Sequence, residues 1–461
     1  MSCLSVALSA ILALIPPPQD ENPSDPCCVW LRRSYSNLFA QSALDSAERD
    51  ILEPDGFRTP HPPSDYSQRF HPDLPVRLQP ILTLMILGVY DCCQNGNIHR
   101  MRMRVNQAIT TAMDSLLHQL DETASEAQRR AWWIAMILGY QSAAVNSSSP
   151  IITTCDPRIT TPYPAFEAGT DGLEPWSLIL KAHAAHDSVS AMVRLITAQN
   201  AQAPSSPDMR DKIAHLDRSI LSLSTECDSI YPSTQSNSAD GLARQSFALI
   251  ACALTHSARI KLHRFRAFSD IPIFLEKHCD LSSLRTDGSS PQEFSSAAVM
   301  EIESFFPLSK DESSMICLKS ALAVSRAFRD IPYPHFPLSR SPDMDSSASD
   351  ASGPGRETYY GSLPYFKCAA MQASYVLYML VHRVRAALLT KRLSICYPLL
   401  NHPDVATEKQ DAHRLVEELR NGAHSLLLFM KRDLVYEGTV AMVNDLDAAY
   451  SSLFGSLQRH R

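Results

Sequence analysis

The residues best suited to chemistry are two histidines and an aspartate in the stretch "HAAHD", residues 183 to 187. His183 and His186 are three residues apart, so a helix would carry both on one face, with Asp187 beside them. Imidazole and carboxylate groups in this arrangement can bind a divalent transition metal. However, the stretch lacks the glutamate general base of H-E-x-x-H, and no G-x-S-x-G turn occurs in the chain. We therefore expect no enzyme activity, no metal site and no cofactor, and a metal-dependent enzyme using His183 and His186 is the less favoured alternative.

Composition argues against two further kinds of site. The chain has 14 glycines in 461 residues, less than half the usual share of about 7%, and no G-x-x-x-x-G-K-[ST] phosphate loop. Its twelve cysteines occur as adjacent pairs, such as Cys27 and Cys28, or singly in apolar stretches, and none forms a C-x-x-C. This usage predicts buried free thiols in a reducing compartment rather than a disulfide framework or a zinc module.

Charge and hydropathy limit the partners. The net charge of −7 disfavours binding of nucleic acid by the chain as a whole. Local basic runs, such as residues 259–266, alternate with apolar residues at helical spacing and are expected to be solvated helix faces. The apolar start, residues 1–18, lacks the basic residues and cleavage site of a signal peptide, and residues 81–90 are too few to cross a bilayer. We expect no membrane partner.

Apolar residues recur at helical spacing from end to end, and the alternation typical of strands hardly appears. The clearest stripe runs from Ala412 to Met430 and keeps the i, i+3, i+4, i+7 pattern for more than four turns. Polar, proline-rich joints separate the stripes. The predicted fold is all-α, a multi-helix bundle or solenoid-like stack of helices with long polar loops, over residues 1–461. Residues 339–358, rich in serine and aspartate, are predicted to be a disordered loop within it.

The stretch "SEAQRRAWWIAMILGY", residues 125 to 140, places two arginines in an unfavourable position. Ser125 and Gln128 have the spacing of a capping box, which starts a helix at this point. Arg129 and Arg130 then fall near the first turn, where the helix dipole disfavours cations. We expect acidic partners to hold them in ion pairs, while Trp133 begins a buried stripe.

The same stretch resembles the central signature of the middle homology region of fungal zinc binuclear cluster transcription factors. In that family an acidic residue and arginines lead into a Trp-Trp helix, followed by Pro-Ile, an acidic residue and Pro-x-Pro. The matching residues here are Glu126, Arg129, Arg130, Trp132, Trp133, Pro150, Ile151, Asp156, Pro162 and Pro164. One departure is the triplet Ser147 to Ser149, where the family has Gly-Arg, so the local turn is expected to differ.

Two later stretches carry the same resemblance. Residues 247–268 look like the family helix that ends in Leu-His-Arg, and residues 363–380 look like its late Cys/Met-Gln/Tyr helix. The matching residues are Leu262, His263 and Arg264 in the first, and Cys368, Met371, Gln372 and Tyr375 in the second. We expect a structural role for all these positions. In the second helix, Cys368, Met371, Tyr375 and Met379 are expected to form the face that packs on the bundle.

The resemblance implies the regulatory domain of a nuclear transcription regulator of metabolic or secondary-metabolite genes. The six-cysteine DNA-binding cluster of the family is absent from this sequence, so no zinc ligand and no DNA-contacting residue is assigned. DNA contact would require a missing or partner module. Implied partners are the transcription machinery or co-regulators, with a small-molecule effector and a homodimer as further options. Two alternatives stay open: a stand-alone helical co-regulator, and binding of an acidic metabolite by Arg129 and Arg130.

Overall fold

The computed structural model of the chain describes residues 1–17, 20, 22–52, 70–166, 175–197, 206–229, 238–269, 300, 303–331, 367–400, 404 and 406–455. These residues form helices joined by loops, and none of them lies in a β-strand. The predicted all-α, multi-helix class is therefore confirmed. The loop predicted at 339–358 lies outside the described residues.

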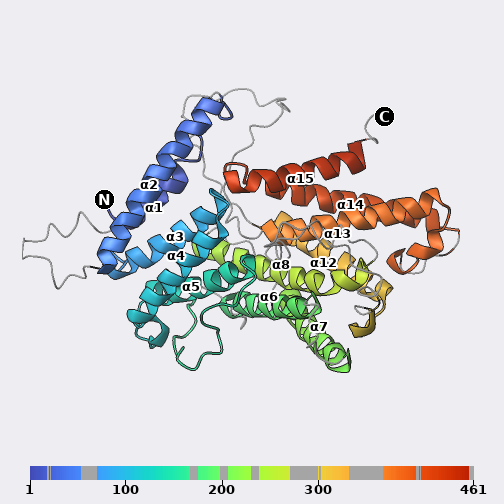
Figure 1. The fold of residues 1–461 in the computed structure, drawn as a ribbon, viewed down its shortest axis with the longest axis horizontal. Helices are drawn as coiled ribbons and strands as arrows, with labels where there is room; N and C mark the ends of the chain where they lie inside the picture. The colour runs from blue at the N-terminus through green and yellow to red at the C-terminus, as the bar shows by residue number, and fades with distance from the viewer. Residues whose placement is uncertain are drawn as a thin grey trace, which may run out of the picture.

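The helices form three groups that follow one another from the left of Figure 1 through its lower centre to its right, from where the chain returns to the first group at the start of α15. The first group comprises α1 (Cys3–Leu12), α2 (Pro26–Leu52), α3 (Gln79–Cys93), α4 (Ile98–Asp114) and α5 (Glu126–Val145). The central group comprises α6 (Pro175–Thr197), α7 (Ser206–Ser229), α8 (Ala239–Ala267) and α12 (Lys310–Asp330). The last group comprises α13 (Lys367–Leu389), α14 (Glu408–Lys431) and α15 (Glu437–Phe454). Short 3₁₀ turns precede α3 at Val76–Leu78, follow α4 at Leu117–Gln119, and follow α13 at Leu393–Cys396 and Pro398–Leu400.

Local sequence signals set several helix ends. The predicted capping box of α5 is confirmed, because Ser125 accepts from the Gln128 N–H and the Gln128 side chain accepts from the Ser125 N–H. Ser309 and Glu312 form the same arrangement at α12. The stripe predicted from Ala412 to Met430 is also confirmed, since its apolar members are buried on α14. These elements form where they do because cap and stripe are both encoded within a few turns.

Helix α8 is the centre of the fold. It packs against α6, α7, α12 and α13, and almost every side chain from Ala248 to Phe268 is buried. Buried apolar residues from α1 to α15 form one contiguous cluster around it. A helix covered on all sides needs no polar face, yet α8 buries several charged residues, and these become important below.

The end of α3 meets the last group of helices where α15 begins. The backbone N–H of Gly438 donates to the Gln94 carbonyl at 3.2 Å. A Cβ on Gly438 would lie 2.6 Å from the Cys93 carbonyl oxygen, so the close approach requires glycine at this position. Beside this contact, Lys367 and Asp433 form an ion pair at 3.3 Å in which both side chains are buried. Burial lowers the pKa of Lys367, and the Asp433 carboxylate opposes that shift.

One described stretch, Val76–Cys93, is long and apolar enough to cross a membrane by length and composition. It comprises a short 3₁₀ turn and α3, and 72% of it is buried inside the protein. Helices α1, α2, α4 and α5 pack against α3. Its apolar surface is therefore covered by neighbouring helices, which is the environment of a core helix.

Candidate functional site

The paired arginines of α5 make the ion pairs expected from their unfavourable position. Arg129 Nη2 lies 2.7 Å from Glu126 Oε1 in the same helix turn, and Arg129 also donates to the Glu122 carbonyl. Arg130 Nη1 lies 2.9 Å from Asp240 Oδ1 in the first turn of α8. Each cation thus has an acidic partner that offsets its repulsion from the helix dipole. The Arg130 pair also ties α5 to the start of the central helix.

The two tryptophans anchor the same helix in different ways. Trp132 is fully buried beside His118, with ring centroids 5.8 Å apart. Trp133 donates its Nε1–H to the Pro162 carbonyl at 2.9 Å and packs on Tyr163 at 4.4 Å. The Pro-x-Pro segment therefore folds back onto the Trp-Trp helix that precedes it in sequence.

Further contacts join this segment to the arginines. Arg130 Nη2 donates to the Ala165 carbonyl at 2.8 Å, and the Ala165 N–H donates to Glu126 Oε1 at 3.3 Å. The Arg130 guanidinium also lies 5.6 Å from the centre of the Phe166 ring, in cation–π range. The first part of the signature, residues 126–133, thus binds the segment at its end, residues 162–166.

The turn between these two parts caps the C-terminal end of α5 with a residue in the left-handed backbone conformation. Ser147 has φ of 50°, and the Ser148 N–H donates to the Ala143 carbonyl at 3.0 Å, the long bond of a Schellman motif. The chain thus makes a glycine-type turn with a serine. Of the signature residues that follow, Pro150 is half-buried and Ile151 is 48% exposed.

Asp156 also lies outside the packed part of the signature. Its Oδ2 pairs with Arg158 Nη2 at 2.8 Å, and the hydrogen bond from Arg158 lowers the pKa of Asp156 to about 2. The Asp156 side chain is 19% exposed, less than that of Ile151. Both residues lie in a surface turn.

The Leu-His-Arg triplet lies wholly inside the protein, since Leu262, His263 and Arg264 each have 0% of their surface exposed. His263 Nε2 lies 2.9 Å from Asp217 Oδ1 on α7, and its Nδ1 lies 3.4 Å from Ser313 Oγ on α12. Burial raises the pKa of Asp217, but the combined effect of His263 and Arg259 is larger and opposite, so the pKa lies below its ordinary value. The triplet holds α7, α8 and α12 together.

Helix α13 differs from the expectation. Cys368, Met371, Tyr375 and Met379 were expected to be its packed face, yet these four are half-buried, and the residues between them are the buried ones. The helix is covered by α8, α12, α14 and α15, so the sides next to these helices are buried more deeply than that stripe. Gln372 is buried and accepts from Ser257 on α8 at 3.2 Å. All three stretches that carry the resemblance therefore meet on α8.

The residues of the stretch first considered for chemistry differ in exposure, since His183 is buried whereas His186 and Asp187 are half-buried. His183 is 3% exposed, its ring stacks near Tyr140 at 6.2 Å, and burial lowers its pKa to about 3. Burial also raises the pKa of Asp187. Within the described ranges, the set of metal-binding atoms that converges is a different one, Asp228, Cys252 and His256. His183 is a neutral core histidine.

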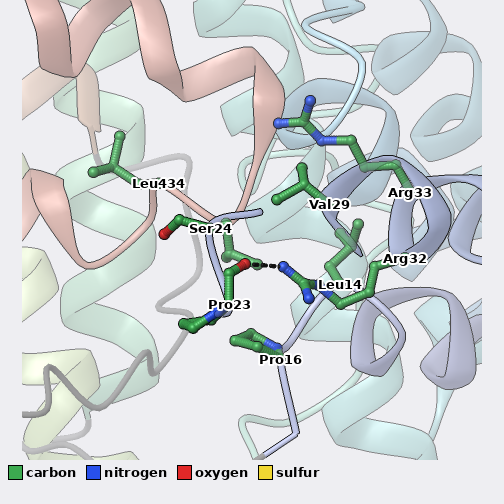
Figure 2. Close-up of a pocket in the computed structure, with 9 residues that line it drawn as sticks. Leu14, Pro16, Pro23, Ser24, Val29, Arg32, Arg33 and Leu434 are labelled. Atoms are coloured by element: carbon green, nitrogen blue, oxygen red, sulfur yellow. Dashed lines mark hydrogen bonds between the residues drawn. The ribbon is translucent and has the colours of Figure 1, made fainter. Parts of the chain in front are cut away.

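Sequence reasoning also missed a cavity of about 220 Å³ (Figure 2). Its walls come from the segment between α1 and α2, from the first turns of α2 and from the link between α14 and α15. They comprise Leu14, Pro16, Pro23, Ser24, Val29, Arg32, Arg33, Leu434 and Val435. Arg32 pairs with Asp20 at 3.0 Å, and Arg33 pairs with Glu437 at 3.5 Å. The apolar walls suit a small, mainly apolar ligand, since both arginines are already paired with carboxylates. No local signal could reveal this cavity, because its walls are about 400 residues apart.

Comparison with known proteins identifies no relative. No family model, no curated protein and no solved structure matches the chain.

Proposed function

We propose that this chain is the regulatory domain of a fungal transcription regulator of the zinc binuclear cluster type, acting in the nucleus on metabolic or secondary-metabolite genes. The observation that carries the proposal is the mutual binding of the two ends of the signature. Arg130 and Trp133 donate to the carbonyls of Ala165 and Pro162. Arg130 and Trp133, two of the residues that match the family signature, thus connect α5 to the Pro-x-Pro segment and to α8.

Output through protein contacts is supported by the surface of α2. Six large apolar side chains of this helix are exposed, and five of them lie within residues 30–39: Trp30, Leu31, Tyr35, Leu38 and Phe39. Contiguous apolar surface of this kind is typical of protein interaction sites. We infer that this α2 surface binds the transcription machinery or a co-regulator, while DNA contact belongs to a separate module.

Regulation by a small-molecule effector is supported by the cavity in Figure 2. A ligand there would contact both the N-terminal helices and the link at Leu434 and Val435, so its binding would depend on how the two ends of the fold are arranged. Arg129 and Arg130 are less suited to bind an acidic metabolite, because their charges are already paired with Glu126 and Asp240.

A tethering assay tests the proposal. The chain is fused to an unrelated DNA-binding module, and transcription of a reporter with the matching DNA site is measured. We expect the fusion to change transcription relative to the module alone. The double variant Trp30→Ser, Leu38→Ser should lose most of that change, because it removes the α2 surface without touching the core. Leu389→Ser, at a site 85% exposed on α13, is the matched control and should behave like the wild type.

A stable fusion with no effect on the reporter would contradict the proposal, and equal losses in the control and the α2 variant would contradict the assigned surface. The transcript upstream of residue 1 separates the two kinds of regulator. An in-frame six-cysteine cluster identifies a DNA-binding factor, whereas a transcript without one favours the stand-alone co-regulator.

A further inference from the structure

A cluster of metal-binding side chains lies where the end of α7 packs on α8. The ligand atoms of Asp228, Cys252 and His256 all lie within 4.8 Å of one another. Cys227, the residue before Asp228, is also buried at this contact, and its Sγ lies 3.7 Å from Thr255 Oγ1 on α8. Cys252 and His256 are four residues apart on α8, so one helix face carries both. Cys227 and Asp228 come from the last turn of α7.

The histidine of this cluster is prepared to act as a ligand. His256 is 7% exposed, and within the described part of the chain its Nδ1 is buried without a hydrogen-bond partner. Its Nε2 has one weak partner, Ser224 Oγ at 3.5 Å. A buried nitrogen without a partner is costly, and a metal ion would relieve that cost.

We propose that Cys227, Asp228, Cys252 and His256 form a structural Zn²⁺ site that joins the end of α7 to α8. Two thiolates, an imidazole and a carboxylate are a typical tetrahedral zinc set. Zinc bonds of 2.0 to 2.3 Å place ligand atoms about 3.3–3.8 Å apart, so the atoms of Asp228, Cys252 and His256, now within 4.8 Å of one another, need to move about 1 Å closer. Cys227 Sγ lies outside that set and needs to move further to become the fourth ligand.

Electrostatics are consistent with a bound cation. The last turn of α7 presents the negative end of its helix dipole to the cluster. Zinc binding displaces one proton from each thiol, so two protons leave and the site carries a net charge of −1.

The first measurement is the metal content of the full chain, purified without a histidine tag. We expect about one equivalent of zinc by mass spectrometry of the metal. After removal of the zinc with a chelator, Co²⁺ should bind and give thiolate-to-cobalt absorption together with the visible bands of a tetrahedral site. Zn²⁺ should then displace the Co²⁺ and raise the melting temperature of the chelator-treated protein.

Matched variants test each ligand. Asp228→Asn should weaken Zn²⁺ binding by at least about 100-fold, since loss of a ligand exceeds the 10- to 100-fold effect of an outer-shell change. Asp211→Asn, at an exposed position of the same helix, makes the same change in charge and should bind normally. Cys252→Ala should abolish tight binding, and Cys227→Ala should reduce the thiolate-to-cobalt band by about half. Cys317→Ala, which removes a buried thiol on α12, is the control for both.

Three results would overturn the proposal. One is a chain that neither retains nor takes up zinc. Another is zinc binding that Asp228→Asn and Cys252→Ala leave unchanged. The third is a Cys227–Cys252 disulfide, seen as a mass 2 Da lower with no metal bound, in protein isolated under reducing conditions. Unchanged cobalt absorption in Cys227→Ala would exclude Cys227 as the fourth ligand.

Discussion

Replacement of His183 should reduce the loss of stability of this protein between pH 7 and pH 5 by about 2 kcal/mol. The side chain is 3% exposed, and burial lowers its pKa from 6.5 to about 3. Above pH 6.5 the ring is neutral in both the folded and the unfolded chain, so it adds no pH dependence. As the pH falls from 6.5 towards 3, the unfolded chain binds a proton that the folded chain cannot bind. Stability is therefore lost progressively across this window.

The magnitude follows from the two pKa values. At pH 5, which is 1.5 units below the unfolded pKa of 6.5, protonation of this residue favours the unfolded state by about 2 kcal/mol. At pH 7 it favours the unfolded state by about 0.2 kcal/mol. In His183→Leu this difference disappears, because leucine has about the volume of histidine and no proton to bind. Wild type should thus lose about 2 kcal/mol more than the variant between pH 7 and pH 5.

The assay is urea unfolding of both proteins at the two pH values, followed by tryptophan fluorescence. His413→Leu is the matched control, since His413 is exposed on α14. It should lose as much stability as the wild type on acidification. If His183→Leu loses as much as the wild type over the same interval, His183 is not buried and neutral, and the reasoning fails.

The other predictions concern packing and backbone geometry, and each is measured by chemical denaturation. Trp132→Ala should lower the free energy of unfolding by about 3–5 kcal/mol because Trp132 is fully buried, whereas Trp30→Ala, 69% exposed, should change it by less than about 0.5 kcal/mol. Gly438→Ala should cost about 1–3 kcal/mol, since the new Cβ would lie 2.6 Å from a backbone oxygen. Ser147→Gly should raise the free energy of unfolding by about 1 kcal/mol, because φ is 50° there and glycine adopts this left-handed conformation without strain. A neutral Trp132→Ala, a stabilised Gly438→Ala or a destabilised Ser147→Gly would contradict these expectations.

The helices could be predicted because their signals are local. The start of α5 depends on Ser125 and Gln128, and the packed face of α14 depends on apolar spacing within that helix. The packed face of α13 could not be predicted in this way. That helix is covered by four neighbours, so its deepest side is set by residues far away in sequence. Apolar spacing alone therefore selected the half-buried stripe that includes Met371 and Tyr375.

The same difference between local and distant signals applies to the candidate sites. The position of Arg130 near a helix start predicts that it needs an acidic partner, but it does not identify Asp240, 110 residues later. The spacing of Cys252 and His256 is visible in the sequence as C-x-x-x-H. It becomes a candidate metal site because α7 brings Asp228 to the same place. A search restricted to C-x-x-C pairs could not find it.

The charged residues inside α8 follow from its central position. A buried polar side chain is costly unless it has a partner, and here the partners lie on different helices. Lys261 donates to Ser190 on α6 at 2.8 Å, while His263 contacts Asp217 on α7 and Ser313 on α12. Turning α8 by one residue, about 100°, would separate all these pairs together, whereas an apolar helix buried on all sides could pack in several rotations. We infer that the buried polar residues mainly specify the rotation of α8, and with it the side of the helix that meets α5, α7 and α13.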